Sequence, residues 1–286
     1  MKDYIRIFGK KLYRSSLTYK FIRLVGKTGK ITGPLLEPKK IDINKVDISI
    51  NNLETALNGF KIILLSDIHA GDYIRPKYID KIVSICNDLE PDIVVIAGDF
   101  TETGPEDIYW CAEKLSKIKT NLGIFAVLGN HDIWNGEEEI SNALIKNQII
   151  VLRNENKTIS INNKEIIIAG VDDFKFGNCD IDKALKNVSP EKTTILISHN
   201  PDIIQNLGEY SINLLLCGHI HGGQWRFPII GPLYIPSKLG KKHAWGLSSS
   251  GNTYVYTSKG VGSTSIPFRI NCPPEVALIT LTSKNV

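Results

Sequence analysis

Short runs of Ile, Val and Leu recur along the chain, and each run stops at a polar, glycine-containing cluster. Runs of this length that end at Gly, Asp or Ser are typical of buried β-strands. They predict strands over residues 62–65, 93–97, 124–128, 195–197 and 214–217, a hairpin over 158–161 and 165–169, and late strands over 253–258 and 276–281.

Between these strands lie stretches with helical spacing. In residues 76–89, Pro76 opens a first turn and Ile79, Ile82, Val83 and Cys86 share one face. Similar stretches predict helices over 106–118, 137–145, 180–188 and 201–207. Strands that alternate with helices indicate βαβ units and buried sheets covered by helices. We therefore expect an α/β domain of two packed sheets over residues 56–286, after an N-terminal extension of residues 1–55.

The N-terminal extension differs in charge from the rest of the chain. Residues 1–30 hold nine Lys or Arg against one acid, although the whole chain carries a net charge of only +4. Its apolar residues, such as Ile5, Phe8 and Leu12, fall on one helical face, which is typical of a helix lying on a membrane surface. A helix packed on the protein's own core is the alternative. The body of the chain lacks the basic excess of a nucleic-acid binder, so nucleic acid is not an expected partner.

Two further features bear on the cellular compartment. No run approaches the roughly 18 apolar residues that span a bilayer, and the start of the chain lacks the apolar core of a signal peptide. The five cysteines are dispersed without a C-x-x-C pair, which favours a reducing compartment. We expect a cytoplasmic protein, peripheral on the cytoplasmic face of the membrane.

Histidines gather in one topological position. Five of the six, together with two Asp and one Asn, directly follow a predicted strand: Asp67, His69, Asp99, Asn130, His131, His199, His219 and His221. Because ligand sites of open α/β folds lie at the carboxyl ends of strands, these side chains are expected to meet at one edge of the core. The spacing of Asp67 and His69 points both side chains the same way in an extended segment.

The residue types indicate a metal centre. Imidazole and carboxylate ligands without thiolate suit divalent Mn, Fe, Zn, Co or Ni. Two such ions about 3.5–4 Å apart can hold a phosphate, provide hydroxide and stabilise the entering and leaving oxygens. A carboxylate is the best bridge between two ions, and Asp99 is the natural choice because Gly98 before it allows close backbone approach.

Taken together, D-I-H (67–69), G-D (98–99), G-N-H-D (129–132), H (199) and G-H-I-H (218–221) resemble the signature of the calcineurin-like metallophosphoesterase superfamily. The segments G-H-I-H-G-G-Q (218–224), F-P-I-I-G-P-L-Y-I-P-S-K-L-G-K-K (227–242) and P-F-R-I-N-C-P-P-E-V (267–276) resemble its YkuE-like bacterial branch. The resemblance covers roughly residues 40–282. It implies a four-layer αββα sandwich of two mixed β-sheets flanked by helices.

The resemblance also implies roles for single residues. One divalent ion would be held by Asp67, His69, Asp99 and His221, and a second by Asp99, Asn130, His199 and His219. His131 would not bind metal but would protonate the leaving-group oxygen or stabilise charge on the phosphoryl group, and Asp132 would orient His131. Gln224, Arg226, Lys259 and Arg269, which follow the last metal motif, are possible substrate contacts.

These expectations favour a metal-dependent phosphoester hydrolase that uses a dinuclear centre and an activated hydroxide. A phosphodiesterase or pyrophosphatase acting on a lipid- or nucleotide-linked substrate suits the basic N-terminus and the apolar segment 227–236. The alternatives are a UDP-2,3-diacylglucosamine pyrophosphatase of lipid A synthesis, which is an analogy within the superfamily, a nuclease, and a non-catalytic scaffold.

Overall fold

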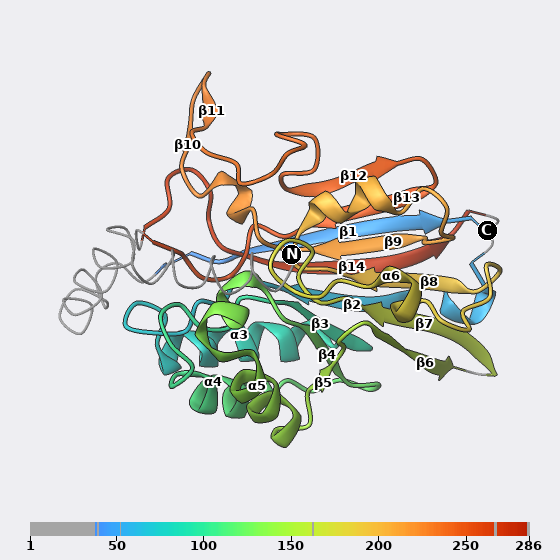
Figure 1. The fold of residues 1–286 in the computed structure, drawn as a ribbon, viewed down its shortest axis with the longest axis horizontal. Coiled ribbons are helices and arrows are strands. Elements are labelled where there is room, and N and C mark those ends of the chain that lie inside the picture. The colour runs from blue at the N-terminus through green and yellow to red at the C-terminus, as the bar shows by residue number, and fades with distance from the viewer. Residues whose placement is uncertain (1–37, 39, 52, 162, 266–267, 285–286) are drawn as a thin grey trace.

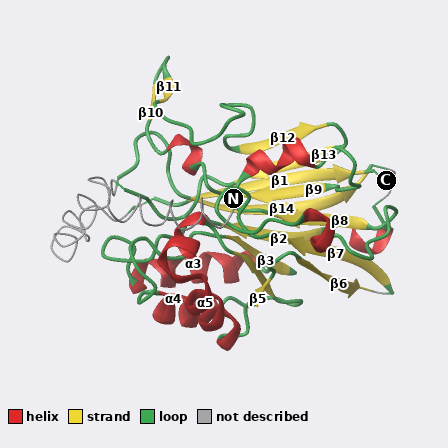
Figure 2. Cartoon of the chain, in the orientation of Figure 1, coloured by secondary structure: helices red, strands yellow, loops and turns green. Residues whose placement is uncertain are grey.

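The computed structural model describes residues 38, 40–51, 53–161, 163–265 and 268–284. Two mixed six-stranded sheets pack face to face, and helices cover their outer faces (Figure 1, Figure 2). The expected α/β class and the four-layer αββα sandwich are therefore confirmed.

The first sheet has the strand order β1-β14-β2-β3-β4-β5. All neighbours in it are parallel except β14 and β2, which are antiparallel. The bounds are β1 Asp42–Ile50, β14 Glu275–Ser283, β2 Phe60–Leu65, β3 Ile93–Ala97, β4 Ile124–Val127 and β5 Ile150–Val151.

The second sheet has the order β12-β13-β9-β8-β7-β6. Its outer pairs are antiparallel hairpins and its inner pairs are parallel. The bounds are β12 Gly246–Ser250, β13 Thr253–Thr257, β9 Leu214–Cys217, β8 Thr193–Ile197, β7 Lys164–Gly170 and β6 Glu155–Ile161. The hairpin expected around residue 163 is thus confirmed as β6–β7.

Three long helices cover the first sheet (Figure 2): α3 Pro76–Leu89, α4 Ile108–Leu115 and α5 Asn130–Lys146. The helix predicted over 76–89 is confirmed at both ends. The one predicted over 137–145 begins earlier, at Asn130, and bends at Gly136, whose φ is 144°. Shorter pieces complete the set: 3₁₀ helices at Thr55–Leu57, Pro201–Asn206 and His221–Gly223, and a small hairpin of β10 Arg226–Phe227 and β11 Gly231–Pro232.

Two predicted helices are wrong in length or type. The segment 180–188 forms only α6, Ile181–Ala184, because the chain soon turns left-handed at Asn187, where φ is 64°. The segment 201–207 is a 3₁₀ helix, closed at its start by the Asn200 side chain, which accepts a hydrogen bond from the Asp202 N–H.

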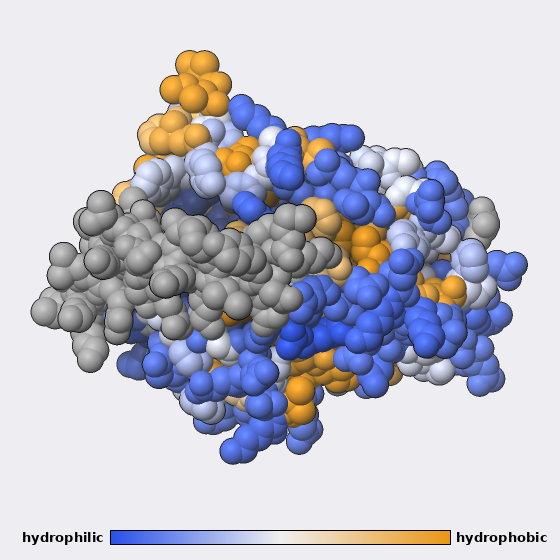
Figure 3. All heavy atoms as spheres, viewed as in Figure 1, coloured by the Kyte–Doolittle hydropathy of each residue, from blue (hydrophilic) through white to orange (hydrophobic). Residues whose placement is uncertain are grey.

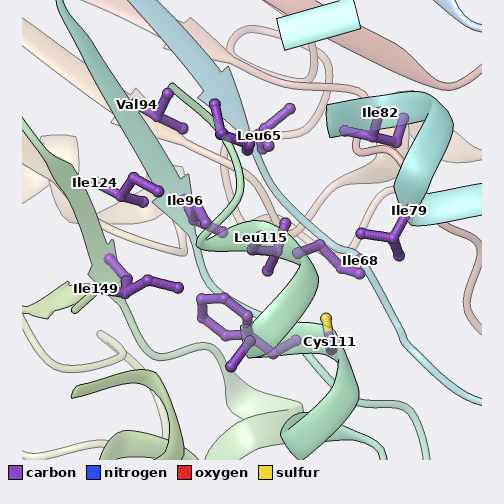
Figure 4. Packing of buried hydrophobic residues seen from close by; sticks show 14 of the residues in the cluster. Leu65, Ile68, Ile79, Ile82, Val94, Ile96, Cys111, Leu115, Ile124 and Ile149 are labelled. Carbon is purple, nitrogen blue, oxygen red and sulfur yellow. The ribbon is translucent and has the colours of Figure 1, made fainter. Parts of the chain in front are cut away.

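Alternation along the central strands separates the layers. In β2, Ile63 and Leu65 pack under the helices, whereas Ile62 and Leu64 face the second sheet. Successive strand residues point to opposite faces, so both faces of such a strand must be apolar when it lies between two layers. Figure 4 shows the helix-side layer, in which Leu65, Ile96 and other strand residues meet side chains such as Ile79 and Leu115.

The strand β1 lies inside the segment 1–55 that the sequence sets apart. It pairs in parallel with β14 over its whole length and forms an edge of the first sheet. Its alternating pattern of half-buried and exposed residues is that of an edge strand. The basic stretch 1–30 lies outside the described residues. Among the described residues, none of the helices has the length and apolar character needed to cross a membrane.

The loops that follow the central strands are tied to one another. The N–H of Asp67 donates to the carbonyl of Gly98, that of His69 to Asp99, and that of Gly218 to His199. The first two bonds join loops of the first sheet and the third joins loops of the second, and the N–H of Gly262 links the two sheets by donating to the carbonyl of Asp67. Side chains carried by these loops are consequently held at one edge of the sandwich.

Candidate metal centre

All of the predicted metal ligands lie at this edge. Asp67 and His69 follow β2, Asp99 follows β3, and Asn130 opens α5 after β4; His199 follows β8, and His219 and His221 follow β9. Six of them are buried and His219 is half-buried. The prediction that strand ends would bring these residues together therefore agrees with the fold.

One group able to hold a metal consists of Asp67, His69 and His221, whose ligand atoms lie within 4.8 Å of one another. Nε2 of His69 is 3.1 Å from Nε2 of His221, and the latter is 3.2 Å from Oδ1 of Asp67. Two imidazole nitrogens and a carboxylate that converge in this way form a donor set suited to a divalent transition metal.

A second group consists of Asp99, His199 and His219. Oδ2 of Asp99 is 3.2 Å from Nε2 of His199, which is itself 3.2 Å from Nδ1 of His219. The same Oδ2 is 3.7 Å from Nε2 of His69, in the first group. Asp99 therefore lies between the two groups.

The Asn130 side chain fits the second group. Its Oδ1 is buried and has no hydrogen-bond partner among the described residues. A buried acceptor without a partner costs free energy unless something else satisfies it. A cation held by Asp99 and the histidines is chemically suited to that oxygen.

The backbone at this edge is strained. Asp67, His69, Asp99, His219 and His221 all have φ between 51° and 72°, in the left-handed region. Non-glycine residues rarely adopt this region, and each one costs about 1–3 kcal/mol. The concentration of this cost on five candidate ligands indicates that the loops are shaped for a site.

Gly98 and Gly129 permit the close approach of two of these loops. Gly98 has φ of 84°, and a Cβ there would lie 2.6 Å from the Gly129 nitrogen. A Cβ on Gly129 would collide with Oδ1 of Asp99. Larger residues at either position would displace the candidate bridging carboxylate.

Neighbouring groups fix the orientation of two imidazoles. Nδ1 of His199 is 2.6 Å from the carbonyl oxygen of Ala97, and a carbonyl only accepts, so Nδ1 carries the proton. Nδ1 of His69 lies 2.5 Å from Oε2 of Glu102. In both rings Nε2 is left to face the cluster, as in histidine ligands whose second nitrogen is held by a carbonyl or carboxylate.

The four histidines divide into two electrostatic classes. Burial disfavours the charged form of His69 and His199, but nearby carboxylates, chiefly Glu102 for His69 and Asp99 for His199, outweigh it and raise their pKa values to about 9 and about 10. Burial and the neighbouring His199 lower the pKa of His219 to about 3, and burial with His69 and Arg269 lowers that of His221. A cation would displace the protons from the first pair.

His131 lies at the rim of the same cluster, in the first turn of α5. Its ring packs edge-on against His69, with centroids 4.8 Å apart. Nδ1 of His131 is 3.2 Å from the carbonyl oxygen of Glu102, so this nitrogen carries a proton. Nε2 is then the atom that can exchange a proton with a bound group.

The structure gives Asp132 a different role from the predicted one of orienting His131. Its Oδ2 accepts hydrogen bonds from the N–H groups of Asp99 and Gly129, and its Oδ1 accepts one from Phe100, all at 2.8–2.9 Å. As the third residue of α5, Asp132 points back toward the helix N-terminus, where free N–H groups gather. It holds the Asp99 loop instead.

Glu102 is a site residue that the sequence reasoning missed. Its carboxylate contacts His69 and accepts hydrogen bonds from Thr264 and the Ser265 N–H, so it joins the cluster to a distant loop. Burial raises its pKa, but His69 and His131 outweigh this and lower it to about 2. The available signal was an acid in the same strand-end loop as Asp99.

The four possible substrate contacts occupy different surroundings. The Gln224 amide pairs with the Thr264 backbone beside the cluster, and the Arg226 guanidinium lies 3.9 Å above the Trp245 ring. Lys259 forms ion pairs with Asp42 and Glu275, at 3.3 and 3.4 Å.

Arg269 is engaged by the protein itself. It donates to the carbonyls of Lys259 and Gly262, and its Nη2 lies 3.2 Å from Nδ1 of His221. Lys259 and Arg269 thus brace the loops, and Gln224 is the candidate contact that lines the adjacent cavity.

The fold and the donor set define a metal-binding hydrolase of the phosphoesterase type. Residues 60–223 match the calcineurin-like phosphoesterase family. The chain is 32% identical to the uncharacterized metallophosphoesterase YkuE of Bacillus subtilis over 87% of this chain and 88% of that one. It is 36% identical to an uncharacterized metallophosphoesterase of Helicobacter pylori (88% and 66% covered), and 30% identical to the phosphodiesterase YaeI of Escherichia coli (78% and 82% covered).

The chain belongs to the calcineurin-like phosphoesterase family, and the YkuE-like resemblance is confirmed. It is an enzyme that hydrolyses phosphoric esters.

Proposed function

We propose that this enzyme works with two divalent metal ions bridged by Asp99. The position of Asp99 Oδ2, 3.2 Å from His199 in one group and 3.7 Å from His69 in the other, carries the proposal. Asp67, His69 and His221 would complete one site, and Asn130, His199 and His219 the other. Mn, Fe, Zn, Co and Ni all suit these donors.

A metal pair in this position supplies Lewis acidity and a nucleophile available at neutral pH. The chain's own contribution lies in placement. His131 would keep its Nδ1 proton on the Glu102 carbonyl and, when the ring is doubly protonated, would donate its second proton from Nε2 to the leaving oxygen. The carboxylate of Asp132 would hold Asp99 in position by accepting hydrogen bonds from the N–H groups of Asp99 and Gly129.

For the substrate we propose a phosphodiester or pyrophosphate linked to a lipid or a nucleotide. A cavity of about 230 Å³ opens beside His219 and His221 and is bounded by Trp225, Tyr234 and Pro236. Aromatic and proline side chains next to a phosphate-binding cluster suit a substrate whose phosphate carries an apolar or aromatic group.

We also propose that the enzyme is cytoplasmic and meets the membrane surface through residues 1–30. The support is the nine Lys or Arg in that stretch, together with apolar residues at helical spacing.

Hydrolysis of bis-p-nitrophenyl phosphate and p-nitrophenyl phosphate tests the proposal. Chelated protein is reloaded with Mn²⁺ and compared with Asp99→Ala and with Asp80→Ala, a substitution of a surface aspartate on α3 as control. We expect metal-dependent turnover, faster on the diester, that is lost in Asp99→Ala and kept in Asp80→Ala. Equal turnover in Asp99→Ala and the unmodified enzyme would refute the bridging role.

A further inference from the structure

The hairpin β10–β11 projects from the body of the molecule and has an apolar tip. Ile229 is fully exposed, and Ile230, Leu233 and Tyr234 are 66%, 58% and 73% exposed. The projection is visible at the upper left of Figure 1, and in Figure 3 its end is an orange knob above a largely blue surface. Four large exposed apolar or aromatic side chains on this short hairpin and directly after it form an apolar patch larger than a water-facing turn needs.

The backbone at the tip makes this composition costly. Ile229 has φ of 72°, a left-handed conformation that turns normally assign to Gly, Asn or Asp. A β-branched apolar residue is disfavoured there by its side-chain sterics and by its exposure to water. Transfer of the tip from water to an apolar medium would offset the free-energy cost of this exposed, strained residue.

The surroundings of the hairpin carry only positive charge along the chain. Residues 210–274 contain six Lys or Arg and no Asp or Glu. Lys259 and Arg269 are engaged by the body of the protein, which leaves Arg226, Lys238, Lys241 and Lys242 in the sequence around the hairpin. Nζ of Lys241 lies 3.4 Å from the carbonyl oxygen of Ile230, and the Arg226 guanidinium is stacked on Trp245 at the hairpin base. An apolar tip inside a basic collar is complementary to a bilayer whose headgroups are anionic.

The segments on either side of the hairpin form a wall of the cavity beside the metal ligands. Tyr234 and Trp225 flank the hairpin and line that cavity together with His219 and His221. The Trp225 ring also stacks on Phe268, which is 42% exposed, so the apolar surface continues from the tip toward the cluster. Whatever the tip contacts therefore lies next to the cavity mouth.

We propose that the β10–β11 hairpin inserts its tip into an anionic lipid bilayer and places the metal cluster against the headgroup layer. A lipid phosphoester held in the bilayer would then reach the cluster without leaving its apolar environment. The second statement rests on the proposed phosphoesterase function, whereas the docking itself does not. The hairpin lies far along the chain from residues 1–30, and the basic collar favours a lipid surface over a second copy of this equally basic face.

Vesicle sedimentation with the full chain tests the docking. The probe is vesicles of equimolar phosphatidylcholine and phosphatidylglycerol, and the variant is Ile229→Ser with Ile230→Ser. The matched control is Tyr109→Ser with Ile145→Ser, which removes two similarly exposed apolar side chains from α4 and α5 on the opposite side of the molecule (Figure 1). We expect the hairpin variant to lose at least about tenfold in vesicle affinity and the control to lose little.

A second variant removes folding as an explanation. Ile230→Trp keeps the tip apolar, so it should bind vesicles like the unmodified chain, and lipids brominated in their acyl chains should quench its added fluorescence; Ile145→Trp should not be quenched. Equal vesicle affinity of the hairpin and control variants, or an unquenched Ile230→Trp, would overturn the docking. The docking would also be overturned if the unmodified chain bound no vesicles but self-associated, and the hairpin variant lost that self-association.

Binding is measured on chelated protein, which cannot turn over the vesicle lipids, so it is independent of the turnover test. Vesicle binding without metal-dependent hydrolysis would remove the proposed function alone, and hydrolysis without vesicle binding would remove the docking alone.

Discussion

The carboxylate of Asp132 offers a sharp test of how the site is held. Its two oxygens accept three backbone N–H groups, from Asp99, Phe100 and Gly129. In Asp132→Asn one oxygen becomes an NH₂ group. Whichever way the amide turns, a donor then faces at least one buried N–H.

The expected cost follows from this count. Hydrogen bonds to a charged group contribute about 1.5–3 kcal/mol each, and a buried N–H left without an acceptor costs about 1–3 kcal/mol. We expect Asp132→Asn to lower the free energy of unfolding by about 2–4 kcal/mol and to weaken Mn²⁺ binding through the displaced Asp99 loop. In the metal-free chain burial, then the charge of Asp99, raises the pKa of Asp132 to about 7. A cation bound at Asp99 would favour the carboxylate form, so urea unfolding is compared on the Mn²⁺-loaded protein above about pH 8.5, where the carboxylate is charged.

Asp173→Asn is the matched control. Asp173 is also buried after a central strand, but only its Oδ1 accepts N–H groups, from Lys175 and Phe176, and an amide oxygen can replace it. Asp173→Asn should lower the free energy of unfolding by less than about 1 kcal/mol. Equal losses in the two variants, or an unchanged stability and metal affinity in Asp132→Asn, would refute the reasoning.

Three further predictions concern the metal ligands. Asn130→Ala should leave metal-free stability within about 0.5 kcal/mol, because its Oδ1 has no partner among the described residues, but elemental analysis should find one bound metal instead of two. Mn²⁺ affinity, measured by chelator competition, should rise as pH increases toward about 9, by up to about tenfold per pH unit for each proton displaced. The reason is that His69 and His199 are protonated below their raised pKa values and must lose that proton to bind metal. An affinity that does not change with pH would contradict this. Gly98→Ala should cost at least about 1–2 kcal/mol of thermal stability and reduce bound metal, since its φ of 84° and the nearby Gly129 leave no room for a Cβ.

The sheet layers and the convergence of the candidate ligands at one edge could be predicted from the sequence. The central strands are short, apolar on both faces and closed by Gly or Asp, so their positions could be predicted, and parallel strands bring their ends to one edge. The edge strand β1 escaped prediction because its apolar alternation is incomplete: Asn44 lies at an inward position and Ile43 is exposed. The helix predicted over 180–188 was too long because the spacing of apolar residues does not reveal the left-handed turn at Asn187.

Features of the site that depend on three-dimensional contact could not be predicted. The left-handed backbone of five ligands has no signature in residue type. Glu102 reaches His69 and the loop at Thr264 only after folding. Asp132 follows His131 in sequence, yet helix geometry turns its carboxylate back onto the Asp99 loop.

Anomalous diffraction from crystals of the chelated enzyme reloaded with Mn²⁺ tests the central claim most directly. We predict two peaks about 3.5–4 Å apart, one among Asp67, His69 and His221 and the other among Asn130, His199 and His219, with Asp99 touching both. A single peak, or two peaks that do not share Asp99, would contradict the bridged two-metal centre.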